Sequence, residues 1–298
     1  MKRFLLKLLL FLAIVAIVDL CAGKIFLLRD YQKTGTRGRI NHVINESEAD
    51  VYVMGSSRAV HTYNSQILED TLRLTVYNIG VDANGMLLAS GIADLAFRRH
   101  KPRLIIFELT PAYDFTDRKN VDNLKFLQYL KPYYDTPEIR EMVAAIDPLE
   151  SLKLHSSLYR LNSSVIDLAT GAFSAEDMPY KGYMPQYTTM KYDPPKPREE
   201  ELRIDPVKQQ ILDSFLEKLK AQDIEIIFTI SPVYSYPTED YDLMKNYIES
   251  KGYIVLDHLR DSGFAGHKRY FSDSVHLNTE GADSLSSVVA SQIKRLGY

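Results

Sequence analysis

The sequence predicts a three-layer α/β/α fold of the flavodoxin-like type, with a five-stranded parallel sheet and a helical insertion. The first observation is that short apolar runs alternate with longer segments whose apolar residues recur every three or four positions, the pattern of βαβ units. The second is that the run Arg103 to Leu109 is almost wholly apolar, as expected of a strand buried on both faces of a parallel sheet. A chain of 298 residues can bury a core of this size.

The individual elements follow from these patterns and from local start and stop signals. Strands are expected at residues 50–54, 74–77, 103–109, 224–230 and 253–256. Helices are expected at residues 65–72, 86–99, 205–220, 239–250 and from about 279 onward. Asn64 or Ser65 can cap the first of these helices, and Asp205 followed by Pro206 opens another. Pro102 and Gly252 mark helix ends.

The alternation of strands and helices stops between residues 110 and 203. We expect residues 115–203 to form an insertion with helical pieces at 123–130, 137–145 and 149–168, and with loops rich in Tyr and Pro. A long irregular insertion at the edge of a sheet is typical of a lid or a binding surface. The alternative is a helical decoration that only packs on the core.

The N-terminus predicts a membrane anchor. Lys2, Arg3 and Lys7 precede the apolar run from Leu8 to Val18, as in a signal-anchor. The run is shorter than the roughly 20 residues that a bilayer span prefers, but Lys7 can snorkel and so lengthen it. We therefore expect an uncleaved anchor over 1–23, a polar juxtamembrane linker over 24–48, and a main domain over 49–298 that lies outside the cytoplasm.

Composition excludes several functional classes. The net charge is −3 and there is no basic stripe, which argues against nucleic-acid binding. Cys21 is the only cysteine and lies in the anchor segment, so the main domain has no disulfide, thiol nucleophile or thiolate metal site. The histidines show no spacing typical of metal ligands, and we expect neither a metal nor a cofactor.

The first chemical motif is the turn after the first strand. The apolar run from residue 50 stops at Gly55, passes through Ser56 and Ser57, and enters a helix. This places a serine hydroxyl at the carboxyl end of a parallel strand, where open α/β sheets have their ligand crevices. The helix that follows favours negative charge at its start. An ordinary turn built from small residues is the alternative.

The second motif lies near the other end of the chain, where Asp273 and His276 are three residues apart. A carboxylate at this spacing can accept from one imidazole nitrogen and leave the other to take a proton from a serine. A capping loop with a surface histidine would explain the pair equally well on its own. Together with the Gly-Ser-Ser turn, the pair favours a serine hydrolase site.

These motifs resemble those of the SGNH/GDSL hydrolases. Gly55-Ser56-Ser57 resembles the first block of the family, with Ser57 at the nucleophile and Ser56 where Asp is common. Residues 77–83 resemble the second block, Asn-x-Gly-x-x-Gly, with Gly80 at its first glycine and Ala83 at its second. Residues 273–276 match the last block, Asp-x-x-His.

The third block departs from the family pattern. Pro111-Ala112-Tyr113-Asp114 stands where the family has Gly-x-Asn-Asp, so the asparagine that donates to the oxyanion is missing. The resemblance implies a serine esterase or O-acyltransferase in which Ser57 is the nucleophile, His276 the acid/base and Asp273 its orienter. The candidate oxyanion donors are the N–H groups of Ser57, Gly80 and Ala83. The candidate substrate-binding residues are Arg58, Asn84 and Tyr113. For Arg58 the alternatives are pairing with a neighbouring carboxylate and a simple position on the surface of the helix.

The anchor adds a second implication of the resemblance. A membrane-anchored bacterial branch of the family acts in the cell envelope on acyl groups of surface polysaccharides, beside membrane acyltransferases. The chain is similar to this branch, which implies an ester-bearing glycan or small acyl ester as the substrate and a membrane acyltransferase as a partner. The alternative is a catalytically weak or inactive protein that binds glycan or assembles an acylation machinery.

Overall fold

The computed structural model describes residues 1–26, 35–117, 124–161, 179–194, 203–235 and 238–298. The chain divides into two compact units, one formed by Met1–Asn41 with Leu127–Asp177 and the other by His42–Phe126 with Met178–Tyr298. This division differs from the predicted boundaries at 23 and 48. The first unit combines the anchor with part of the predicted linker and part of the insertion.

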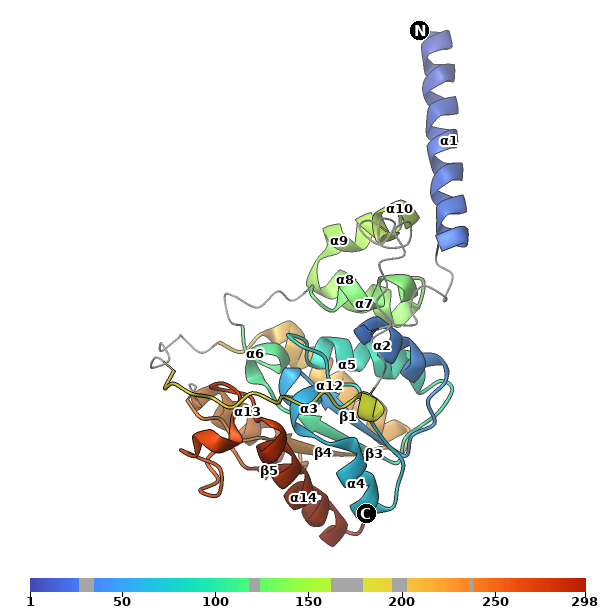
Figure 1. The fold of residues 1–298 in the computed structure, drawn as a ribbon. Helices are drawn as coiled ribbons and strands as arrows, with labels where there is room; N and C mark the ends of the chain where they lie inside the picture. The colour runs from blue at the N-terminus through green and yellow to red at the C-terminus, as the bar shows by residue number, and fades with distance from the viewer. Residues whose placement is uncertain (27–34, 118–123, 162–178, 195–202, 236–237) are drawn as a thin grey trace. The chain divides into compact units, whose positions relative to one another are not determined.

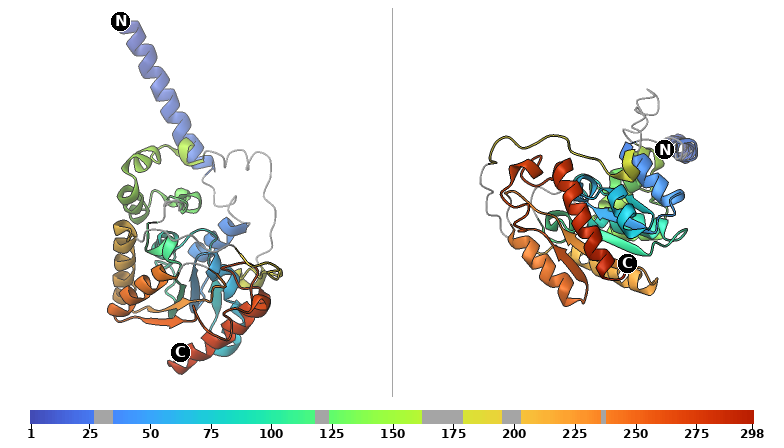
Figure 2. Two further views of the ribbon diagram at one scale, coloured as in Figure 1. Left: turned by 90° about the vertical axis from the view of Figure 1, so that its left-hand side faces the viewer. Right: turned by 60° about the horizontal axis from the view of Figure 1, so that its bottom comes forward.

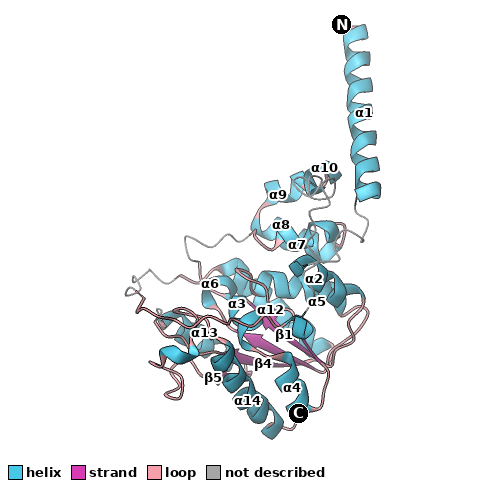
Figure 3. Ribbon diagram, viewed as in Figure 1, coloured by secondary structure: helices cyan, strands magenta, loops and turns pink. Residues whose placement is uncertain are grey.

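The second unit contains the sheet. Its five strands are β1 (Val51–Gly55), β2 (Val76–Asn78), β3 (Leu104–Glu108), β4 (Glu225–Ile230) and β5 (Ile254–Asp257), all parallel (Figure 3). Their order is β2-β1-β3-β4-β5, so the direction of winding reverses between β1 and β3. The predicted fold class and the five predicted strands are confirmed. In folds of this order, ligands bind at the reversal point, outside the carboxyl ends of β1 and β3.

Helices cover both faces of the sheet (Figure 1). Alternate strand residues, such as Val51, Val53 and Ile106, join a buried cluster with α3 (Ser57–Thr62), α4 (Ser65–Leu72) and α14 (Thr279–Arg295). Figure 2 shows α14 beside α4. The opposite face is covered by α5 (Met86–Ala96) and α12 (Pro206–Ala221), and there the rings of Phe107 and Phe228 are 5.8 Å apart.

The remaining elements of this unit are short or peripheral. They are α6 (Pro111–Asp114), α13 (Glu239–Ser250), η3 (Pro179–Gly182) and η4 (Lys268–Tyr270). Two predicted helix starts are confirmed. Asn64 accepts a hydrogen bond from the Gln66 N–H at the start of α4, and Asp205 accepts from two N–H groups at the start of α12. The predicted helix 86–99 is shorter in the structure and ends at Ala96.

The first unit is helical in its described residues. Its elements are α1 (Lys2–Phe26), α7 (Leu127–Leu130), η2 (Lys131–Tyr133), α8 (Pro137–Ile146), α9 (Pro148–Lys153) and α10 (Ser157–Leu161). Among the described helices, α1 alone is long and apolar enough over Lys2–Cys21 to cross a membrane. The predicted single helix 149–168 is wrong, since the chain turns between α9 and α10, and residues 162–168 lie outside the described residues.

The segment predicted as a polar linker over 24–48 contains a helix. Residues 35–45 form α2 (Gly35–Asn45). Ile40, Val43 and Ile44 recur at helical spacing and are buried, so this short segment has an apolar stripe that packs. The polar and basic composition of the segment hid that stripe.

The turn after β2 approaches α3 closely at Gly80. Asn78 Nδ2 donates to the carbonyls of Ala59 and Tyr63, which ties the turn to α3. A Cβ atom at Gly80 would lie 2.5 Å from the Val60 nitrogen and 2.8 Å from the Ala59 Cβ. Glycine is therefore required here for space.

We expect Gly80→Ala to lower the free energy of unfolding by about 1–3 kcal/mol, because the added methyl forces backbone apart in a packed region. Denaturant unfolding followed by circular dichroism measures the change. Gly263→Ala is the matched control, since a Cβ atom there would meet only the carboxylate end of Asp261, at 3.2 Å. Equal stability of the two variants would show that α3 and the β2 turn can separate at no cost.

Candidate active site

The turn between β1 and α3 presents one serine and buries the other. Gly55 has a φ of 133°, and a Cβ atom there would lie 2.6 Å from the Glu108 carbonyl oxygen, so only glycine fits. Ser56 is the N-cap of α3. Its Oγ accepts from the Arg58 N–H and lies 2.7 Å from the Thr110 Oγ1, fully buried. Ser57, the first residue of α3, is partly exposed.

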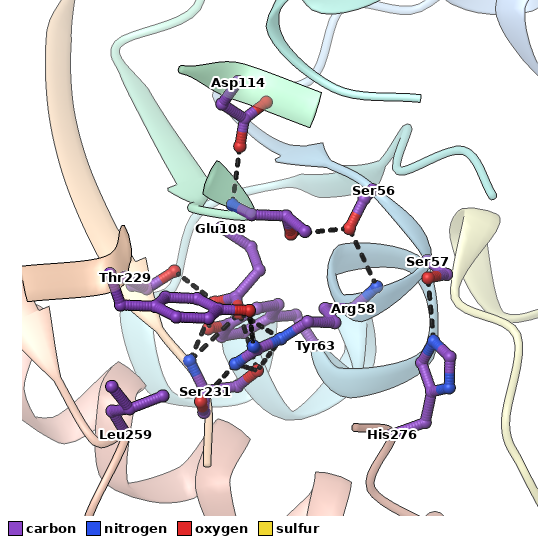
Figure 4. A network of polar contacts seen from close by, with 12 residues as sticks. Ser56, Ser57, Arg58, Tyr63, Glu108, Asp114, Thr229, Ser231, Leu259 and His276 are labelled. Atoms are coloured by element: carbon purple, nitrogen blue, oxygen red, sulfur yellow. Dashed lines mark hydrogen bonds and ion pairs between the residues drawn. The ribbon is translucent and has the colours of Figure 1, made fainter. Parts of the chain in front are cut away.

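Ser57, His276 and Asp273 lie in a chain of hydrogen bonds. The Ser57 Oγ is 2.7 Å from the His276 Nε2, as Figure 4 shows, and the His276 Nδ1 is 2.8 Å from the Asp273 Oδ2. The carboxylate can only accept, so Nδ1 carries a proton and Nε2 is left to accept the serine proton. The structure thus brings together three residues that the sequence analysis singled out from opposite ends of the chain.

The loop that carries His276 is fixed by its own hydrogen bonds. The Asp273 Oδ1 accepts from the N–H groups of Val275 and His276, both at 2.9 Å. Ser272 N–H donates to the His276 carbonyl, and Asn278 caps α14 directly after the loop. Burial raises the pKa of Asp273, but the His276 imidazole and these N–H groups outweigh it and bring the pKa to about 2. The carboxylate is thus ionised throughout the neutral range.

Arg58 follows Ser57 in sequence but points into the protein. Its side chain is 3 % exposed, and its Nε lies 3.0 Å from the Glu108 Oε1 (Figure 4). The guanidinium also donates to the hydroxyl and carbonyl of Ser231 and to the Tyr241 hydroxyl. The predicted substrate-binding role of Arg58 is therefore wrong, because its donors are engaged inside the protein. The alternative, pairing with a neighbouring carboxylate, describes it correctly.

Glu108 is a structural residue that the sequence analysis missed. It ends β3, is fully buried, and accepts from the Tyr63 hydroxyl at 2.5 Å and the Ser231 Oγ at 2.6 Å. The Thr229 hydroxyl and the Ser231 N–H also donate to it. The available signal was a single acid at the end of an otherwise apolar strand, since a buried carboxylate requires partners.

The three predicted oxyanion donors differ in their surroundings. Gly80 N–H donates to its neighbour Asn78 Oδ1 at 2.9 Å, so the predicted oxyanion role of Gly80 is wrong. Ala83 has a φ of 55°, the left-handed conformation that favours glycine, at the place where the family resemblance implies glycine. The roles of the Ser57 and Ala83 N–H groups stay predictions.

Two further candidate residues lie on the turns that follow β2 and β3. Asn84 is buried, and its Nδ2 donates to the Asp82 carbonyl at 3.0 Å within its own turn. Tyr113 lies half-buried on α6, and its Cβ would be 2.7 Å from a Cβ atom at Gly85. These positions place Asn84 and Tyr113 on neighbouring turns, and their substrate-binding roles stay predictions.

Asp114 joins these two turns and was not assigned a role from the sequence. Its Oδ1 accepts from the Met86 N–H at 2.7 Å, and its Oδ2 accepts from the Thr110 N–H at 2.6 Å. Full burial raises the pKa of Asp114 to about 7, against the lowering effects of both N–H groups and of Lys208. Lys208 is itself buried and donates to the carbonyls of Ala112 and Thr116, so α6 is held from two sides.

A second His–Asp pair stands next to the first. The His61 ring meets the His276 ring edge-on, with 5.7 Å between centroids. Its Nδ1 lies 2.7 Å from the Met184 carbonyl, which can only accept, and its Nε2 lies 3.2 Å from the Asp82 Oδ1. His61 fastens the extended segment around Met184 to α3.

The site is built from serine, histidine and carboxylate chemistry. Among the described residues, no group of three or more His, Cys, Asp or Glu side chains is arranged to hold a metal ion. The one cysteine, Cys21, lies in α1.

Two of the solved structures that are similar to this chain are distant from it in sequence. No protein-family model and no curated protein sequence matches the chain. A solved lipolytic protein of the G-D-S-L family from Desulfitobacterium hafniense is 14 % identical over 82 % of this chain and 98 % of its own, with a TM-score of 0.41. An acylhydrolase from Bacteroides fragilis is 13 % identical over 83 % and 86 %, also with a TM-score of 0.41. Function is therefore argued from the geometry of the site.

The raised pKa of Asp114 predicts a pH-dependent effect of Asp114→Asn. An acid whose pKa is higher in the folded than in the unfolded state stabilises the fold below about pH 4. This contribution is lost as the pH rises to about 7. Asparagine does not titrate, and it replaces one acceptor oxygen by a donor that faces an N–H group, which costs about 1–3 kcal/mol. The variant should therefore fall further below wild type at pH 5 than at pH 8.

Denaturant midpoints of the full chain in detergent, measured at both pH values, check this expectation. Asp117→Asn changes an exposed acid three residues away and serves as the control. An equal loss of stability at pH 5 and pH 8 for Asp114→Asn would contradict the assignment.

Proposed function

We propose that the chain is a serine esterase or O-acyltransferase of the SGNH/GDSL type. The observation that carries the proposal is the hydrogen-bonded series Ser57, His276 and Asp273 at the carboxyl edge of the sheet, with distances of 2.7 Å and 2.8 Å. Ser57 comes two residues after the end of β1, at the reversal point of strand order where α/β folds bind ligands. Nucleophile, base and orienting carboxylate are thus within reach of one another without rearrangement.

The reaction follows from these positions. The Ser57 Oγ attacks the ester carbonyl carbon while its proton passes to the His276 Nε2. Asp273 stabilises the imidazolium through Nδ1, and the N–H groups of Ser57 and Ala83 donate to the oxyanion. When the tetrahedral intermediate collapses, the leaving alcohol takes the proton from His276 and an acyl ester remains on Ser57. Water or a sugar hydroxyl then gives a proton to His276 and attacks the acyl carbon. As the acyl–Oγ bond breaks, His276 returns that proton to the Ser57 Oγ, and the acid or the new sugar ester leaves.

The substrate is proposed to be an acyl ester, such as an acetyl ester, of a bacterial surface glycan. Support comes from α1, which can cross a membrane, and from the basic residues that precede its apolar run. We propose that this anchor holds the catalytic unit at the outer face of the inner membrane, within reach of envelope glycans. A membrane acyltransferase that delivers acyl groups is the proposed partner, in line with the anchored branch that the sequence resembles.

A second candidate is a protein of the same fold that binds glycan or assembles the acylation machinery without turnover. Tyr113 favours it, because it stands where the family has an asparagine that donates to the oxyanion. Loss of one such donor costs about 10²–10³ in rate. Reactivity of Ser57 decides between the two candidates.

A fluorophosphonate probe tests that reactivity. We expect wild-type chain to be labelled, and Ser57→Ala and His276→Ala each to lose labelling by at least about 10³-fold, because triad members act as a unit. In-gel fluorescence of the full chain in detergent measures the labelling, and circular dichroism confirms folding. Ser56→Ala is the matched control. It changes the neighbouring buried serine and should keep the label, whereas label lost only in Ser56→Ala would refute the assignment of the nucleophile.

A further inference from the structure

An acidic residue near the end of α1 has a specific set of partners. The Asp19 carboxylate accepts from the Ser156 Oγ at 2.7 Å, from the Ser157 N–H at 2.9 Å and from the Leu158 N–H at 2.9 Å. All of these residues belong to the first compact unit. The carboxylate thus holds the start of α10 against α1.

The length of α1 defines where this contact lies if the helix spans a bilayer. Sixteen residues separate Arg3 from Asp19, which is about 24 Å along a helix axis. The hydrocarbon core of a bilayer is about 30 Å thick. With Arg3 at one boundary, Asp19 lies about 6 Å inside the opposite boundary. The three donors from α10 then replace the water that the carboxylate loses there.

Three leucines of α9 and α10 are exposed. Leu149 and Leu152 are 60 % and 68 % exposed and lie three residues apart, on one face of α9. Leu158, whose N–H donates to Asp19, is 41 % exposed. The same unit buries Leu130 and Leu154 completely, so it has an interior that accommodates leucine.

The acid between the two exposed leucines is turned away from them. The Glu150 side chain is 11 % exposed, and its carboxylate binds Lys153 at 3.1 Å and the Tyr159 hydroxyl at 3.0 Å. The outward face of α9 is therefore apolar between Leu149 and Leu152, and the acid before the helix, Asp147, is bonded to the Leu149 N–H as its N-cap. Lys153 lies at its end and is 42 % exposed.

We propose that α9 and α10 lie in the membrane interface, with Leu149, Leu152 and Leu158 inserted at the boundary of the acyl chains. The occupant of this surface is the lipid bilayer itself. Because α10 is bonded to Asp19, and Asp19 lies at the end of the span, these leucines are held at the depth where the helix leaves the hydrocarbon. The inference rests on the proposed anchoring of the chain by α1.

Site-specific fluorescence in nanodiscs tests the proposal. The full chain carries Cys21→Ala, which removes its only cysteine, and single cysteines at Leu12, Leu152, Leu158 or Glu141 are labelled with the environment-sensitive dye NBD. Glu141 is an exposed charged residue on α8 of the same unit and serves as the matched control. Lipids with a nitroxide on the acyl chain quench dyes that lie in the bilayer.

Interfacial helices are buried by about 5–10 Å, so the dyes at Leu152 and Leu158 should be quenched at least about twofold more than the dye at Glu141. The dye at Leu12, in the middle of α1, reports the anchor separately. If Leu12 is quenched while Leu152 and Leu158 match Glu141, the interfacial proposal is wrong and the anchor stands. If the dye at Leu12 is not quenched, both are wrong, while labelling of Ser57 by the fluorophosphonate probe is unaffected.

Asp19→Ala then tests the contact that holds α10. The variant removes the acceptor and should reduce quenching at Leu152 toward the Glu141 level while leaving Leu12 quenched. Unchanged quenching at Leu152 would show that the Asp19 contact does not set its depth. Leu149→Gln with Leu158→Gln provides a second test, since it leaves Asp19 and its hydrogen bonds in place and should also lower the quenching at Leu152.

Discussion

The buried ion pair between Glu108 and Arg58 is the interaction on which the arrangement of the site depends. It joins the end of β3 to the first turn of α3, and neither side chain is more than 3 % exposed. Two charges lose their hydration when they are buried, and this cost offsets much of their mutual attraction. Such a pair therefore stabilises a fold only when its remaining hydrogen bonds are satisfied. Here Tyr63, Thr229 and Ser231 donate to the carboxylate, which ties α3, β3 and the end of β4 to one point. Removal of one partner of a buried pair typically costs about 3–5 kcal/mol.

The position of this pair explains how a nucleophile is held at the edge of the sheet. The Arg58 side chain points inward, whereas Ser57, one residue earlier, is partly exposed and faces His276 (Figure 4). Ser56 caps α3 from within and is buried. The packing of α14 on α3 and α4 brings the loop before α14 to the same edge, so that His276 reaches Ser57 although 219 residues separate them. The strand order and the packing of α14 on α3 and α4 thus bring these distant parts of the sequence together.

The sequence predicts the parts of this arrangement that are local. The five strands follow from apolar runs, and Ser57, Asp273 and His276 from short motifs, since the spacing that brings Asp273 to His276 is only three residues. The predictions for Arg58 and Gly80 are wrong because each binds a partner inside the protein, Glu108 and Asn78 respectively. The motifs that suggested their roles do not show these bonds. Asp114 binds the turns at Met86 and Thr110, which are 28 and 4 residues away. Its role follows only from the structure, which shows where these two turns lie. The division into two units depends on packing between distant helices.

Ser57 is the proposed covalent nucleophile, and trapping of an acyl-enzyme tests this most directly. Full-length chain in detergent is mixed with 4-nitrophenyl acetate and quenched in acid before deacylation, and intact mass and peptide fragmentation are measured. We expect one acetyl group on Ser57, and none in the variant that carries His276→Ala. An acetyl group located on a different residue, or ester turnover with no covalent intermediate, would contradict it.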